Sequence, residues 1–369
     1  MAKKNWREFA RNNVVTIMFI VVCAVCMVFS GYTPSYVMYE LFGRLSRNAF
    51  IVLALIIPIV AGMGINFAIT IGAMAAQIAC ILVLEWGLQG FGSFLAAAAL
   101  TVPMAALFGF GIGKILNKMK GQEMIGGMIL GYFANGLYQL LCLFIFDNII
   151  PINNPNLTIK GSSGIANTID LSKAGGMGGT LEKLWQLPVM KSLFSMVKVP
   201  MATFGIVALL CLFNVVLMRT RLGQQFRAVG QNRTVANAAG INVDKVRIIA
   251  ITISTVLAGW GQLIFVQNLG AFQTYGAADQ VGLYAGAAIL VGGASVVRTT
   301  NTQALLGTVL FHLMFILAPA AGKNLFGDAA IGEYFRVFMC YGVIALALVM
   351  HAWSSIAPKK KHHKATDKA

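Results

Sequence analysis

Uncharged amide and hydroxyl side chains are the groups that could act chemically inside the long hydrophobic stretches of this 369-residue chain. Amide groups inside a lipid bilayer are unfavourable unless they face one another or a water-filled path. Two interpretations follow: hydrogen bonds between helices, or a neutral polar lining that suits an uncharged hydroxylated solute. The candidate lining residues are Asn66, Phe67, Thr70, Gln77, Asn135, Gln139 and Gln262.

Residue patterns that support catalysis or ion coupling are sparse. The sequence contains no Gly-x4-Gly-Lys-Ser/Thr phosphate-binding loop and no GxSxG or HExxH motif, so we expect no catalytic residues, no metal site and no cofactor bound by this chain. His312 could titrate inside a hydrophobic stretch, although a lone histidine there is typical of a packing residue. Ion-coupled transporters use buried carboxylates or lysines as relays. Such residues are sparse in the hydrophobic stretches of this chain, which disfavours an ion-coupled mechanism.

The six cysteines all lie in apolar stretches, at Cys23, Cys26, Cys80, Cys142, Cys211 and Cys340. We predict free thiols that pack as small hydrophobic side chains. The first two have CxxC spacing but no second pair downstream, so the sequence predicts neither a zinc site nor a redox site.

The composition is that of a membrane protein, with 58% hydrophobic and 11% charged residues against about 25% charged residues in soluble domains. A helix that crosses a bilayer needs about 20 mostly apolar residues. The sequence predicts an all-α, polytopic transmembrane bundle of about ten spans that forms a single domain over residues 1–369. The windows lie near 14–31, 48–62, 66–84, 93–113, 124–146, 199–218, 248–267, 281–297, 303–320 and 335–353.

The formal charge of +16 is distributed unevenly along the chain. Lys and Arg concentrate in residues 1–13, 114–120, 219–247 and 354–369, which share one side of the membrane if the windows alternate, while Arg44 and Arg47 fall on the other. The positive-inside rule places the basic side and both termini in the cytoplasm. Membrane lipid, with no nucleic acid, therefore accounts for the charge. We interpret the N-terminal segment as a retained first helix rather than a signal peptide.

The loop over residues 147–198 is predicted to be extracytoplasmic. It opens with turn residues between Pro151 and Asn156, continues through a glycine-rich stretch, and ends in a segment where apolar residues alternate with lysines. That final segment suits an interfacial amphipathic helix. It would act either as a lid over the bundle or as a docking surface for an external partner.

The loop over residues 219–247 is predicted to be cytoplasmic and to have three parts. A basic start should continue the sixth helix out of the membrane, and Gly230-Gln231-Asn232 should then break the chain. A short helix over 234–239 follows, with Asn232 or Thr234 as its N-cap and Gly240 after its last turn. The result is either a compact protruding helix or a lipid-facing loop stabilised by basic residues.

Residues Thr220 to Ile248, followed by Ala258, Gly259 and Gly261 in AGWGQ, resemble the permease subunits of bacterial ABC importers of the ribose and branched-chain amino acid type. The family pattern is a basic TxxGxxxxAxGxN segment, a short Ala-rich helix, and a membrane helix with LAGxxG. Residues Ala287 to Leu310 are similar to its second signature, a GG-S turn before a glycine-containing helix. The resemblance continues more weakly over Asn48 to Leu116 and so covers most of the chain.

The resemblance implies a function and a set of partners. The chain would be a permease in the bacterial inner membrane that forms the path for a small polar solute, with ATP and Mg bound by a separate ATPase subunit. A second permease copy or a paralogue and an extracytoplasmic solute-binding protein would complete the importer. The short cytoplasmic helix would be the coupling helix that docks on the ATPase. Its docking residues would be Arg227, Gly230, Asn232, Arg233, Thr234, Ala236, Asn237, Ala239 and Gly240.

The chain departs from the sugar-permease pattern at one place. Sugar permeases commonly carry GGIDLSVG, where Gly62 to Gly72 here reads GMGINFAITIG, with Asn66 in place of the acid and Ala68 in place of the serine. Residues Lys120 to Leu141 resemble the nucleoside branch instead. The solute stays open among sugars, nucleosides and related compounds. Two other classes remain as alternatives: an ion-coupled secondary transporter that uses His312, and a membrane scaffold without a path.

Overall fold

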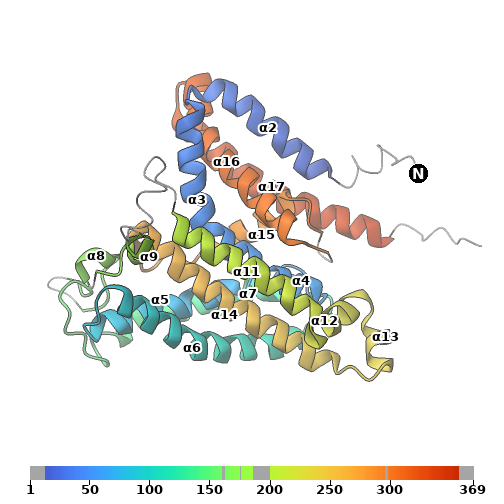
Figure 1. Ribbon diagram of the computed structural model, residues 1–369, viewed down its shortest axis with the longest axis horizontal. Coiled ribbons are helices and arrows are strands. Elements are labelled where there is room, and N and C mark those ends of the chain that lie inside the picture. The colour runs from blue at the N-terminus through green and yellow to red at the C-terminus, as the bar shows by residue number, and fades with distance from the viewer. Residues whose placement is uncertain (1–12, 160–162, 175, 186–199, 296–297, 357–369) are drawn as a thin grey trace, which may run out of the picture.

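The computed structural model of the chain describes residues 13–159, 163–174, 176–185, 200–295 and 298–356. Helices make up most of it, and α13 lies at the opposite end of the bundle from α8 and α9 (Figure 1). The helices are α2 (Val14–Ser30), α3 (Pro34–Ala54), α4 (Ile56–Val60), α5 (Ile69–Glu85), α6 (Gly90–Lys118), α7 (Glu123–Leu140), the π-helical turn η1 (Leu141–Ile145), α8 (Leu171–Ala174), α9 (Thr180–Trp185), α11 (Met201–Arg219), α12 (Arg221–Gln231), α13 (Arg233–Ala238), α14 (Val243–Leu269), α15 (Val281–Val291), α16 (Asn301–Phe326) and α17 (Ala329–Ile356). The strands β1 (Thr168–Asp170) and β2 (Ala271–Gln273) pair antiparallel.

The helix lengths agree with a membrane bundle. Every predicted window contains a helix, and within the described part of the chain six helices are long and apolar enough to cross a bilayer. Three shorter apolar helices, Val14–Ser30, Ile69–Glu85 and Val281–Val291, lie among them. The last two are almost wholly buried, so other helices cover them.

The second predicted span begins much earlier than its window. Helix α3 starts at Pro34, where a proline is tolerated because the first turn of a helix needs no N–H donor. Arg44 and Arg47 therefore lie on this helix, and the prediction that placed them in a loop is wrong. The Arg47 guanidinium donates to the backbone oxygen of Gly43, and Arg44 lies 3.9 Å from the Glu40 carboxylate.

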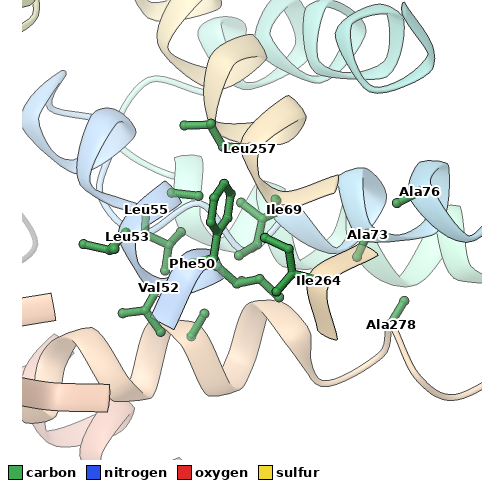
Figure 2. Packing of buried hydrophobic residues seen from close by; sticks show 14 of the residues in the cluster. Phe50, Val52, Leu53, Leu55, Ile69, Ala73, Ala76, Leu257, Ile264 and Ala278 are labelled. Carbon is green, nitrogen blue, oxygen red and sulfur yellow. The ribbon is translucent and has the colours of Figure 1, made fainter. Parts of the chain in front are cut away.

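Helix α14 is the centre of the core and packs against α6, α5 and α3. Its contact with α6 is close because glycines face it: a Cβ placed on Gly113 would lie 3.1 Å from the Cα of Ile248. Figure 2 shows Leu257 and Ile264 of α14 around the ring of Phe50, with Ile69 of α5 beside them. Apolar side chains of α3, α5 and α14 thus pack together in the core.

The described part of the 147–198 loop folds over the end of the bundle that carries β1 and β2. The backbone N–H groups of Asn153 and Asn154 donate to the carboxylate of Glu85 at the end of α5, at 2.8 and 3.1 Å. The predicted amphipathic helix falls largely on residues 186–199, which lie outside the described residues. The basic residues 1–12 and 357–369 lie outside them too.

The cysteine prediction is confirmed, because all six thiols are free. Five are buried and Cys211 is half-buried.

Candidate functional site

The chain changes direction sharply between α11 and α12. Thr220 is extended there, and its side-chain oxygen accepts a hydrogen bond from the backbone N–H of Gly223. Gly223 lies against the backbone of Leu217, where a side chain would overlap the preceding helix. The prediction that the sixth helix simply continues out of the membrane is therefore wrong: a capped, separate helix follows it.

Helix α13 forms where a short helix was predicted, but each end lies one residue earlier, at Arg233 and Ala238. The side-chain oxygen of Asn232 accepts from the backbone N–H groups of Thr234 and Val235, at 3.0 and 3.1 Å, which selects Asn232 over Thr234 as the N-cap. Gly240 has φ +80°, the left-handed conformation that glycine adopts without strain. The Asn232 cap and the Gly240 turn thus define α13 as a short helix between α12 and α14.

The end of α12, just before α13, contacts the break between α4 and α5 (residues 61–68) through two glycines, Gly230 of α12 and Gly62 of the break. A Cβ placed on Gly62, which has φ +73°, would lie 2.8 Å from the Cα of Gly230, and a Cβ on Gly230 would overlap the carbonyl group of Val60. A groove of about 440 Å³ runs alongside this contact, lined by Gly64, Phe67 and residues of α7. The chain that leads into α13 is therefore in backbone contact with the end of α4 and the break that follows it.

An ionic cluster reinforces the same contact. One guanidinium nitrogen of Arg233 donates both to the backbone oxygen of Gly62, at 2.8 Å, and to the carboxylate of Glu123, at 2.9 Å. Arg247 also donates to that carboxylate oxygen, and its other terminal nitrogen donates to the side-chain oxygen of Asn117 at 2.8 Å. The Arg247 side chain is fully buried, the Glu123 side chain is 8% exposed and the Arg233 side chain is 35% exposed.

Sequence reasoning missed this cluster. It counted Glu123 and Arg247 as loop charges, whereas α14 begins at Val243 and takes Arg247 inside the bundle. A buried charge is strongly unfavourable unless it is paired and hydrogen-bonded, and each of the two supplies the other's partner. One feature of the sequence could have indicated the pair: Glu123 and Arg247 each adjoin a predicted window, and both lie on the same predicted side of the membrane.

The predicted docking residues differ in exposure. The exposed ones are Arg227, Asn232, Thr234, Asn237, Ala239 and Gly240, whereas Gly230 and Arg233 are half-buried. The side chain of Ala236 is only 3% exposed and packs on the bundle.

Val235, which the sequence analysis did not single out, is 63% exposed. The surface that α13 presents to solvent is therefore centred on Val235 rather than on Ala236.

Three of the predicted path residues meet at the start of α5. The Asn66 side-chain oxygen accepts from the backbone N–H of Ala68, and the Thr70 hydroxyl donates to the backbone oxygen of Phe67. The Phe67 ring lies against α15, where a Cβ on Gly286 would be 3.0 Å from it. All three path residues are buried.

The remaining path residues lie elsewhere. Gln77, about two turns further along α5, is 1% exposed, and within the described part of the chain neither of its amide atoms has a hydrogen-bond partner. Asn135 and Gln139 are half-buried on α7, which packs against α5. Gln262 belongs to α14 and lines a separate cavity. The structure thus groups the α5 and α7 residues and sets Gln262 apart.

Comparisons with known proteins agree on one class. A family model described as "Branched-chain amino acid transport system / permease component" matches residues 37–349. The nucleoside ABC transporter permease protein NupC of Lactococcus lactis subsp. cremoris is 26% identical over 309 residues, which are 81% of this chain and 86% of that protein. The ribose import permease protein RbsC of Escherichia coli K12 is 27% identical over 280 residues, 76% of this chain and 73% of that one. The autoinducer 2 import system permease protein LsrC of Yersinia pseudotuberculosis is 27% identical over 222 residues, 59% and 57% of the two chains.

Proposed function

This chain belongs to the family of branched-chain amino acid transport system permease components, and we propose that it forms one half of the path of an ATP-driven importer for a small neutral polar solute. Its class follows from the family: it is a multi-pass inner-membrane permease subunit of an ABC importer. Permease subunits of this kind are generally non-catalytic. We therefore assign ATP and Mg binding to a separate ATPase subunit.

The contact between α13 and the α4–α5 break is the observation that carries the proposal. A partner that displaced α13 would also displace Gly62, because Arg233 is hydrogen-bonded to the Gly62 carbonyl and Gly230 is in van der Waals contact with Gly62. Asn66 and Phe67 follow Gly62 within one short segment. Movement on the surface would thereby reach the proposed path residues through this short, mostly buried segment.

The proposal includes an orientation. With about ten spans and both termini in the cytoplasm, α13 lies on the cytoplasmic side, where an ATPase can reach it. The arginines of the adjacent segment, Arg219, Arg221 and Arg227, support this placement because basic residues concentrate on the cytoplasmic side of membrane proteins. The opposite end, with β1, β2, α8 and α9, then faces the extracytoplasmic solute-binding protein (Figure 1). A second permease copy or a paralogue would supply the other half of the path.

The proposed solute is neutral because the proposed path offers amides and no charge. Asn66, Gln77, Asn135 and Gln139 each present a donor and an acceptor, which suits hydroxyl groups and ring nitrogens. The relatives' names refer to nucleosides, ribose and autoinducer 2. We propose a solute from the sugars and nucleosides.

An ion gradient is not favoured as the driving force. Among the described residues, Glu123 is the buried acid, and two arginines already neutralise it. A relay carboxylate has to be free to take up and release a proton or a sodium ion, whereas this carboxylate is already paired with Arg233 and Arg247.

Transport in a reconstituted system tests the proposal. The chain would be placed in proteoliposomes with its ATPase and its solute-binding protein, and uptake of radiolabelled uridine, adenosine and ribose would be followed. We expect uptake that needs hydrolysable ATP and stops with a non-hydrolysable analogue. Uptake driven by a proton or sodium gradient without the ATPase would contradict the proposal.

A further inference from the structure

A second polar feature lies away from α13, in a cavity of about 330 Å³ lined by residues of α3, α14, β2, α15, α16 and the segment after β2. Each of these elements contributes a polar side chain. None of the side chains that line the cavity carries a formal charge when His312 is neutral. The polar ones are Asn48, Gln262, Gln273, Gln280, Tyr284 and His312.

Two of these side chains are buried without a full set of partners. Gln262 is fully buried; its side-chain oxygen has no hydrogen-bond partner within the described residues, and its nitrogen reaches only the Ala277 carbonyl, at 3.5 Å. His312 is 6% exposed, and its Nδ1 atom has no partner in the same part of the chain. Buried polar atoms are nearly always hydrogen-bonded because an unpaired one loses its hydration without compensation. Both residues line the same cavity, so a single polar ligand there could satisfy both.

The aromatic lining of the cavity adds a second kind of contact. Tyr284, Phe265 and Phe272 supply rings beside the amides. The volume lies near the lower end of the roughly 300–1,000 Å³ of small-molecule sites. Amide side chains pair with the donor and acceptor edges of nucleobases, and aromatic rings stack on their faces. The combination of amides and rings without charge fits a flat, neutral ring that carries both donors and acceptors.

We propose that this cavity is a solute-binding site within one permease subunit and that it takes a neutral nucleoside. The proposal rests on the proposed function, because it identifies the class of solute that the importer carries and where the permease holds it. Gln262 and His312 hydrogen-bond to the base, and Tyr284 contacts its face.

The cavity is connected to α13 by a continuous set of contacts. Tyr284 and Ala285 of α15 line the cavity, while Gly282 and Gly286 of the same helix lie against Phe67. Phe67 lies in the α4–α5 break, which α13 contacts at Gly62. A displacement of α13 would therefore reach the wall of the cavity through α5 and α15, which would allow nucleotide binding to the ATPase to change the fit of the solute.

Protection of a cysteine at the cavity tests the site directly. Gln273 is exposed and lines the cavity, so a Gln273→Cys variant of the full chain should react with a membrane-impermeant maleimide. The native thiols are buried, apart from half-buried Cys211. The variant would be assembled with its ATPase in proteoliposomes and labelled in the presence of saturating uridine, adenosine or ribose. We expect uridine or adenosine to slow the labelling severalfold.

Second-site variants show whether the buried polar groups hold the ligand. In the Gln273→Cys background, Gln262→Leu and His312→Phe should abolish protection. Thr255→Val and Thr308→Val are matched controls on the same two helices, since each hydroxyl is buried and already bonded to its own helix; both should keep protection. Should either cavity variant fail to assemble, protection of the Gln273→Cys chain alone still decides whether the cavity is occupied.

The labelling and uptake results together distinguish failure of the proposed binding site from failure of the proposed importer function. If the assembled importer takes up a nucleoside with ATP but no nucleoside slows labelling, the cavity is not the binding site. Protection by ribose alone would overturn the nucleoside class. Absence of ATP-dependent uptake of every probe would overturn the proposed function, and this site with it.

Discussion

The guanidinium group of Arg233, the first residue of α13, donates to the backbone carbonyl oxygen of Gly62, with nitrogen and oxygen 2.8 Å apart. The two residues are 171 positions apart in the sequence. The bond joins an exposed helix to the break that precedes α5, and the shared carboxylate of Glu123 fixes the arginine in place. A surface element and a buried segment are thus held as one unit.

The contact between Gly230 and the α4–α5 break should not tolerate a side chain. Gly230→Ala would drive a methyl group into the carbonyl of Val60 and cost about 1–3 kcal/mol, the usual range for overpacking. Because the methyl group separates α12 and α13 from α4, we expect ATP-driven uptake to fall more than ATPase activity does. The ratio of solute transported to ATP hydrolysed in proteoliposomes measures this.

Gly111→Ala is the matched control for that change. Gly111 lies in the middle of α6, and a Cβ there meets no atom within 4 Å. We expect an unchanged transport ratio. Equal losses in both variants would show that Gly230 matters only for stability.

The carboxylate of Glu123 should be essential for folding of the bundle. Glu123→Gln removes the carboxylate that pairs with the fully buried Arg247, and breaking a buried pair from one side costs roughly 3–5 kcal/mol. Equilibrium unfolding in mixed micelles measures the loss. The exposed pair of Lys120 and Asp244, 3.6 Å apart, is the control, because Asp244→Asn should change stability by no more than about 1 kcal/mol.

The N-cap of α13 can be tested without changing its surface. Asn232→Ala removes the acceptor for two backbone N–H groups and should cost about 1 kcal/mol. Hydrogen exchange at Thr234 and Val235 should become faster. Asn232→Asp keeps a capping oxygen and should restore slow exchange; if it does not, the cap is not what orders the helix.

Local features of this chain were predictable from the sequence, whereas contacts between distant residues were not. The turn at Gly240 was predicted correctly, and the cap at Asn232 was one of two predicted candidates, since each depends on one side chain and its nearest neighbours in the sequence. The start of α3 at Pro34 was missed because polar and charged residues up to Asn48 dilute the hydropathy of that helix.

The ionic cluster of Glu123, Arg233 and Arg247 could not be predicted from the sequence. Glu123 and Arg247 are 124 residues apart, and nothing in either local sequence states that they meet. Gln262 was predicted to face a polar space, and it lines the cavity described above. The packing interpretation of His312 explains its contacts with the rings of Phe311 and Phe315. It does not explain why its Nδ1 atom has no hydrogen-bond partner among the described residues, which depends on how the surrounding helices pack.

The exposed side of α13 gives the sharpest test of ATPase docking. Val235 is 63% exposed, whereas its neighbour Ala236 is 3% exposed. Val235→Glu should therefore leave the unfolding transition unchanged, since the carboxylate stays in water, yet place a charge in the interface and abolish co-purification with the ATPase. Val235→Ile should retain binding because it keeps an apolar surface of similar shape. Ala236→Glu, by contrast, buries the charge and should lower stability by several kcal/mol. Normal ATPase binding and uptake in the stable Val235→Glu variant would mean that the partner docks on another surface.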